Sequence, residues 1–149
     1  TLRFPHAHFQ MVRVGIGLYE GVMSLKSYVA FIKTVPAGSF IGYHATYRTK
    51  KKTQIATVSI GYADGYARAL SNQGKVIIRG KLYPIVGIIS MDMLTIDVGN
   101  DRIKVGDEVV LIGQQKNKKI TVQQVAHLQK TIDYEIMSGI GKRVPRIYL

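Results

Sequence analysis

Short runs of aliphatic and β-branched residues alternate with glycine-, proline- and lysine-containing segments through most of the chain. This pattern is typical of β-strands, because β-branched side chains favour extended backbone and glycine and proline favour turns. The segments expected to form strands are 25–35, 53–60, 75–78, 85–89, 93–98 and 108–112. Strands this short, separated by glycine turns, predict a mainly β fold, namely a small closed Greek-key-like β-barrel.

The segment 85–89 is continuously apolar rather than alternating, so it is expected to be buried on both faces or to cross the barrel interior. Short helices are expected only near the C-terminus. Thr121 and Gln124 fit a capping box at the start of one helix. A second helix is expected from near Thr131, where isoleucines follow at four-residue spacing, to Gly139 or Gly141.

An earlier apolar run, MVRVGIGLY at residues 11–19, is predicted to form a short strand that contains one arginine, Arg13. A buried guanidinium needs an acceptor, and this segment supplies none. The alternative is an edge strand from which the arginine reaches solvent. The glycines that follow Arg13 would let backbone amides approach a phosphate closely.

The chain has 149 residues, of which 46% are hydrophobic, and it contains no cysteine. It is therefore expected to form a globular fold without disulfides and without a thiolate metal site, which fits a reducing compartment. No apolar run approaches the roughly 18 residues that a membrane span requires. A cytoplasmic protein with no bound metal and no membrane segment is expected.

The net charge of +12, from 21 Lys and Arg against 9 Asp and Glu, suggests a polyanionic partner. The lysines, however, gather at 50–52 and at 116–119, between strand-like runs, and no aromatic residues are interleaved with them. Nucleic-acid-binding grooves combine basic and aromatic residues along strands. Solvated loop tips are therefore favoured, and a basic β-barrel module that binds nucleic acid is the alternative.

The segment SIGYADGY at residues 59–66 places a tyrosine, Tyr62, between two glycines at the end of a predicted strand. Asp64 and Gly65 form a dipeptide that favours a tight turn. A tyrosine held on such a turn can transfer a proton if its surroundings tune its pKa. The alternative is a hairpin tyrosine that packs against its own turn.

Three segments, MVRVGIGLY (11–19), GYADGY (61–66) and SMDM (90–93), resemble in that order segments of the alanine racemase family. The ending RVPRIY (143–148) resembles the C-terminus of that family. The resemblance covers nearly the whole chain. It implies that residues 1–20 are the end of an N-terminal (β/α)8 barrel domain and that residues 21–149 are a C-terminal β-barrel domain.

The resemblance also implies chemistry. Alanine racemases hold pyridoxal phosphate on a lysine of the N-terminal domain and remove and return the Cα proton of an amino acid. In their homodimers, the position of Tyr62 supplies one acid/base group to the partner subunit's cofactor. A free phenol has a pKa of about 10, which positive charge or hydrogen bonds to the phenolate must lower for efficient catalysis at neutral pH.

Four further positions match the family. Arg13 matches the residue that donates to the pyridine nitrogen and keeps it unprotonated, because guanidinium does not release its proton. Gly15 and Ile16 match positions whose backbone amides contact the cofactor phosphate. Met91 matches a residue near the substrate carboxylate, with a place in a core strand as the alternative. Asp92 is expected to organise the turn behind Met91.

Several positions, among them Ser90, Met93 and Glu20, depart from the family pattern, and two of them bear on the substrate entrance and the phosphate. Ile88 stands where many members have an arginine near the substrate entrance, and Lys142 stands where some have a tyrosine that contacts the phosphate. Serine therefore remains an alternative substrate to alanine. A pure dimerisation module would differ only in that Tyr62 reaches no cofactor. Because a (β/α)8 barrel takes about 250 residues, the chain alone is expected to be inactive.

Overall fold

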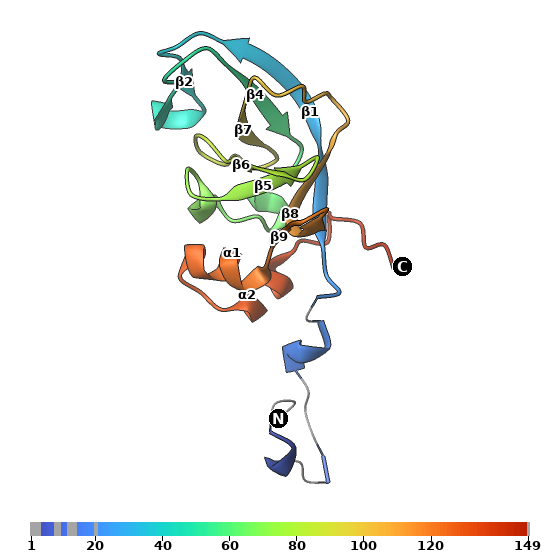
Figure 1. Cartoon of the computed structure of the whole chain (residues 1–149). Coiled ribbons are helices and arrows are strands. Elements are labelled where there is room, and N and C mark those ends of the chain that lie inside the picture. The colour runs from blue at the N-terminus through green and yellow to red at the C-terminus, as the bar shows by residue number, and fades with distance from the viewer. Residues whose placement is uncertain (1–3, 8–9, 12–14, 20, 149) are drawn as a thin grey trace.

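The computed structural model describes residues 4–7, 10–11, 15–19 and 21–148. Its centre is a seven-stranded antiparallel sheet in the neighbour order β6-β5-β8-β1-β4-β7, with β9 paired to β8 (Figure 1). The strands are β1 (Leu25–Val35), β4 (Thr53–Val58), β5 (Lys75–Ile78), β6 (Lys81–Pro84), β7 (Leu94–Gly99), β8 (Glu108–Gln115) and β9 (Lys118–Ile120). A separate two-stranded sheet pairs β2 (Phe40–Ile41) with β3 (Tyr47–Arg48).

The two ends of this strand order come together. Immediately after β6, Ile85 forms an antiparallel bridge with Ile96 of β7, and the Val86 amide donates to the Thr95 carbonyl at 2.9 Å. The sheet thus curls into a barrel-like shape, and this isolated bridge connects its two ends without pairing β6 to β7. The prediction of a mainly β fold is confirmed. Strands β4 and β5, and likewise β7 and β8, are consecutive in sequence but not neighbours in the sheet, as in a Greek-key-like arrangement.

The barrel interior is filled by aliphatic side chains because alternate residues of each strand point inward. In β7, Leu94, Ile96 and Val98 are buried while the residues between them are partly exposed. The whole run Val109–Ile112 of β8 is buried, since this strand also contacts the first C-terminal helix, at residues 122–129.

The predicted strand at 85–89 is wrong beyond the bridge at Ile85. Gly87 has φ +78°, in the left-handed region, and a Cβ there would lie 2.8 Å from the Ile41 carbonyl oxygen. The chain therefore bends away instead of extending. The expected burial is confirmed, because Ile85, Val86 and Ile89 are all at most 2% exposed.

Two α-helices follow the barrel, α1 (Val122–Gln129) and α2 (Asp133–Gly139). The predicted capping box is confirmed: the Gln124 amide donates to Thr121 Oγ1 at 3.1 Å, and the Thr121 amide donates to Gln124 Oε1 at 2.8 Å. The second helix starts two residues after Thr131 and ends at Gly139. Short 3-10 turns, which the sequence did not predict, are η1 (Pro5–Ala7), η2 (Gly15–Tyr19), η3 (Tyr43–Ala45), η4 (Tyr62–Asp64) and η5 (Arg68–Leu70).

The predicted strand at 11–19 is wrong where the chain is described, since Gly15–Tyr19 form the 3-10 helix η2. Gly15 begins this helix with φ +62°, a left-handed conformation that interrupts an extended strand. Arg13 lies outside the described residues. In Figure 1, η2 lies away from the barrel strands.

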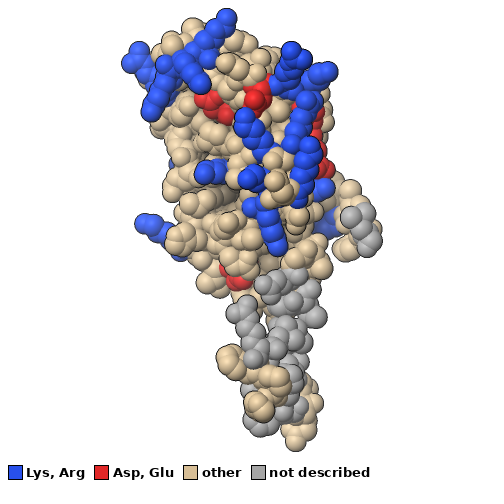
Figure 2. Space-filling model, in the orientation of Figure 1, with Lys and Arg blue, Asp and Glu red and all other residues tan. Residues whose placement is uncertain are grey.

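The lysine clusters are exposed, as predicted. Residues 50–52 form a bend between β3 and β4, whereas Lys118 and Lys119 lie in β9 rather than in a turn. In Figure 2, lysine and arginine side chains lie mainly on the upper part of the visible face, with acidic side chains among them. Among the described residues, no helix has the length and apolar character needed to cross a membrane.

Candidate active site

Tyr62 stands at the first position of the turn η4, a few residues after β4 ends. Gly65 closes the turn with φ +98°, and its amide donates to the Tyr62 carbonyl at 3.1 Å. The tight turn predicted at Asp64 and Gly65 is therefore confirmed. Tyr62 is 42% exposed, so its ring is available at the surface of the domain.

The loop 90–93 lies against this turn. The Tyr62 amide donates to the Ser90 carbonyl at 3.0 Å, and the Ala63 amide donates to the Met91 carbonyl at 3.0 Å. The structure thus brings Tyr62 and Met91, two residues singled out from the sequence, onto adjoining segments. Met91 is 51% exposed and outside the strands, so a core-strand role for it is wrong.

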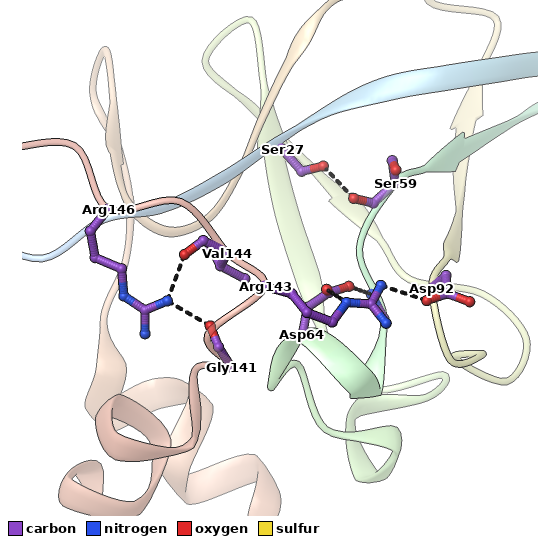
Figure 3. Close-up of polar contacts among 9 residues, drawn as sticks. Ser27, Ser59, Asp64, Asp92, Gly141, Arg143, Val144 and Arg146 are labelled. Carbon is purple, nitrogen blue, oxygen red and sulfur yellow. Dashed lines mark hydrogen bonds and ion pairs between the residues drawn. The ribbon is translucent and has the colours of Figure 1, made fainter.

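Asp64 stabilises the turn from inside. Its Oδ2 accepts from the Gly61 amide at 2.9 Å, which fixes the backbone on both sides of Tyr62. Its Oδ1 lies 3.2 Å from Nε of Arg143, a residue near the chain end (Figure 3). The Asp64 side chain is only 12% exposed, so the guanidinium compensates a largely buried carboxylate.

The same arginine reaches the second loop. Nη2 of Arg143 lies 2.6 Å from Oδ1 of Asp92, the residue after Met91. The hydrogen bond to Asp92, and then the charge of Asp64, raise the pKa of Arg143. Arg143 was not predicted to be a site residue. The signal available in the sequence was the RVPR motif together with an aspartate shortly after each of the site residues Tyr62 and Met91.

A serine pair ties β1 to the start of the site. Ser27 of β1 donates through Oγ to the Ser59 carbonyl at 3.0 Å, just before the Tyr62 turn. The segment that leads from β4 to Tyr62 is therefore held at Ser59 by β1 and at the Tyr62 turn by the 90–93 loop.

The N-terminal positions lie apart from Tyr62 and next to α2. The Ile16 amide donates to the hydroxyl of Tyr134 at 3.4 Å, which is longer than the usual 2.7–3.2 Å. A Cβ at Gly15 would lie 3.0 Å from the same hydroxyl oxygen. The Ile16 amide is held only weakly, and Gly15 has no side chain to block access to it. A backbone amide and a hydroxyl can both donate to an anionic oxygen, so these residues fit a phosphate group. Tyr134 was not singled out from the sequence.

Two of the positions that depart from the family, Ile88 and Lys142, both follow the Tyr62 turn in the chain. Ile88 is half-buried between Gly87 and Ile89, and Lys142 is exposed beside Arg143. Within the described part of the chain, no group of three or more histidine or acidic side chains could hold a metal ion.

A β-barrel that presents a tyrosine on a locked turn, followed by two short helices, defines the class of the fold. Residues 22–148 match the family model described as "Alanine racemase, C-terminal domain". The chain belongs to this family.

Comparison with individual proteins gives the same family. The chain is 45% identical to the alanine racemase of Symbiobacterium thermophilum over 97% of its own length, but it spans only 42% of that protein. Its structure is similar to that of Bacillus anthracis alanine racemase with bound L-Ala-P, with a TM-score of 0.81 and 45% identity over 85% of this chain and 32% of the other. Bartonella henselae alanine racemase with covalently bound pyridoxal phosphate gives a TM-score of 0.78 and 38% identity, over 85% of this chain and 34% of that one.

Proposed function

We propose that this chain is the C-terminal part of a longer, pyridoxal-phosphate-dependent alanine racemase that interconverts L- and D-alanine in the cytoplasm. Residues 1–20 then end the N-terminal barrel domain and residues 21–149 form the C-terminal domain. The relatives named above are alanine racemases, which favours alanine over serine as the substrate. The chain spans about two-fifths of the Symbiobacterium relative, which fits one domain of a two-domain enzyme.

The observation that carries this proposal is the Tyr62 turn. The turn is fixed by amide hydrogen bonds to the 90–93 loop and by Asp64, yet the ring is 42% exposed. A rigid backbone under an exposed phenol is the arrangement expected for a group that acts outside its own domain. In a homodimer, Tyr62 would enter the partner subunit's active site and act there as one of the two acid/base groups.

The cofactor would be held mainly by the N-terminal domain. From this chain, Arg13 would donate to the pyridine nitrogen, and the amides of Gly15 and Ile16 would donate to the phosphate. When bound, pyridoxal phosphate supplies an electron sink that makes the Cα proton of the amino acid acidic. Tyr62 would remove or return that proton on one face, and Met91 would line the space for the substrate carboxylate.

The experiment that tests this proposal is racemisation by the full-length protein, wild type beside Tyr62→Phe, with L-alanine and L-serine as substrates. We expect alanine to be preferred and the variant to lose most of its activity while keeping its pyridoxal phosphate absorbance. Tyr28→Phe, which removes the hydroxyl of a 55% exposed tyrosine on β1, is the matched control. Full activity in Tyr62→Phe, or equal loss of cofactor and activity, would reject the catalytic role.

A further inference from the structure

Arg143 contacts both segments that carry the proposed site residues. Its Nε lies 3.2 Å from Asp64, two residues after Tyr62, and its Nη2 lies 2.6 Å from Asp92, directly after Met91. Figure 3 shows the guanidinium between the two carboxylates, which come from different loops. One side chain therefore links the Tyr62 turn to the Met91 loop, in addition to the backbone hydrogen bonds between them.

The segment that carries Arg143 is itself tightly folded. Arg146 donates to the carbonyl oxygens of Gly141 and Val144, each at 2.6 Å (Figure 3). It also donates to the Ile140 carbonyl at 2.8 Å. The Val144 amide donates to the Gly141 carbonyl at 3.2 Å. The two arginines of RVPR thus make different contacts. Arg146 binds backbone carbonyl groups of residues 140–144, and Arg143, which lies on that segment, binds Asp64 and Asp92.

This folded segment also contacts the Tyr62 turn through its backbone. The Gly141 amide donates to the Asp64 carbonyl at 2.9 Å, and a Cβ at Gly141 would lie 3.0 Å from the Ala63 carbonyl oxygen. The turn is therefore held on one side by the 90–93 loop and on the other by the chain end.

We propose that Arg143 is a positioning residue for racemisation, which sets the placement of the Tyr62 phenol by holding Asp64 and Asp92 together, and that Arg146 supports it. This inference rests on the proposed function. Arg143 is not assigned contact with the substrate or the cofactor. Its effect is transmitted through the two aspartates and the backbone that they stabilise.

The geometry requires an arginine. A planar guanidinium offers several N–H donors in fixed directions and can bind two carboxylates at once, whereas a lysine ammonium is a single compact charge on a flexible stem. Catalysis is sensitive to such placement, because a shift of about 1 Å in a reacting group can cost about 100-fold in rate.

The test uses the full-length holoenzyme with Arg143→Gln and Arg143→Lys. We expect kcat/KM for alanine to fall by about 10- to 100-fold in Arg143→Gln and by less in Arg143→Lys, with cofactor content unchanged. With Cα-deuterated alanine, the primary isotope effect should rise in the direction in which Tyr62 removes the proton, and should not rise in the other direction, in which Tyr62 returns the proton. A residue needed only for folding would not produce this asymmetry.

The matched control is Arg79→Gln. Arg79 pairs with Asp107 at 2.8 Å on the barrel, and its side chain is 47% exposed against 54% for Arg143. We expect it to keep wild-type kcat/KM and isotope effects. If Arg143→Gln gives the same values as Arg79→Gln, the positioning role is rejected.

Asp92→Asn keeps the test valid if Arg143→Gln fails to fold. Because Asp92 and Arg143 act through the same contact, Asp92→Asn should reproduce the one-sided isotope effect, and its combination with Arg143→Lys should cost less than the sum of the two changes. Additive losses, or an unchanged isotope effect in Asp92→Asn, would also overturn the proposal. Activity retained in Tyr62→Phe would instead reject the proposed function, whatever the arginine variants show.

Discussion

Gly61 lies so close to the carbonyl oxygen of Met91 that a Cβ atom at position 61 would overlap it. The backbone of Gly61 has φ −147°, which any residue can adopt, so close approach rather than backbone conformation requires glycine here. The Ser90 carbonyl oxygen crowds the same position. The absence of a side chain at Gly61 therefore allows the Tyr62 turn to lie against the 90–93 loop.

Gly61→Ala should separate these two segments. We expect the free energy of unfolding to fall by about 1–3 kcal/mol, because the added methyl group meets backbone atoms rather than a flexible side chain. Urea denaturation of the chain measures this loss. Gly139→Ala is the control, since a Cβ there meets nothing within 4 Å and should leave stability nearly unchanged. Equal effects of the two substitutions would contradict the close approach.

A substitution at Ile96 tests the contact between the two ends of the sheet. It is fully buried and forms the bridge with Ile85 that joins the two ends of the strand order. We expect Ile96→Ala to lower the free energy of unfolding by about 2–5 kcal/mol through lost burial and the cavity left behind. Ile132→Ala, at a position that is 63% exposed, should change stability by no more than about 0.5 kcal/mol. A small effect at Ile96 would mean that this contact is loosely packed.

The capping box of α1 gives a local prediction. Thr121→Ala removes the acceptor for the Gln124 amide and should cost about 1 kcal/mol of stability. Thr121→Ser retains the hydroxyl oxygen and should lie close to wild type. Thermal unfolding of the three proteins ranks them, and a Ser variant as unstable as the Ala variant would indicate that the threonine methyl group, not the cap, matters.

Tyr66 gives a prediction at alkaline pH. It is 2% exposed, and burial raises the pKa of its phenol. An unfolded tyrosine ionises at about pH 10, so the stabilising contribution is fully present below that pH and is lost as the pH rises further. At pH 11 the loss amounts to about 1.4 kcal/mol.

Tyr66→Phe should therefore lose less stability than wild type between pH 9 and pH 11, as measured by urea unfolding at both values. Tyr148→Phe is the control, because Tyr148 is 91% exposed and its removal should leave the alkaline loss unchanged. If Tyr66→Phe and wild type lose the same amount, the ionisation of Tyr66 does not contribute.

Local signals in the sequence were sufficient for several elements. The boundaries of β1 and β5 were predicted correctly, because their β-branched runs are bounded by proline and glycine. Strand β6 was missed because Pro84 and the short LYP run give little alternation. The strand predicted at 85–89 failed because Gly87 bends the chain in response to a close approach from Ile41, which no local pattern reveals.

The candidate site likewise contains residues that local sequence patterns identify and residues that they do not. The turn at Tyr62 and the family resemblance of Met91, Gly15 and Ile16 could be identified from sequence motifs. The roles proposed for them, and for Arg13, remain predictions. Tyr134 and Arg143 could not be identified in this way, because each contacts its partner across 51 or more residues of chain.

By itself, the sequence determined the β-rich class, the capped first helix, the glycine-bracketed tyrosine and the likeness to alanine racemases, because these depend on neighbouring residues. Only the tertiary structure decided that Ile85 and Ile96 form the bridge between the two ends of the sheet and that Arg143 joins Asp64 to Asp92. The physical reason is that such contacts depend on the distances between segments brought together by folding, and those distances are set by the packing of the whole core.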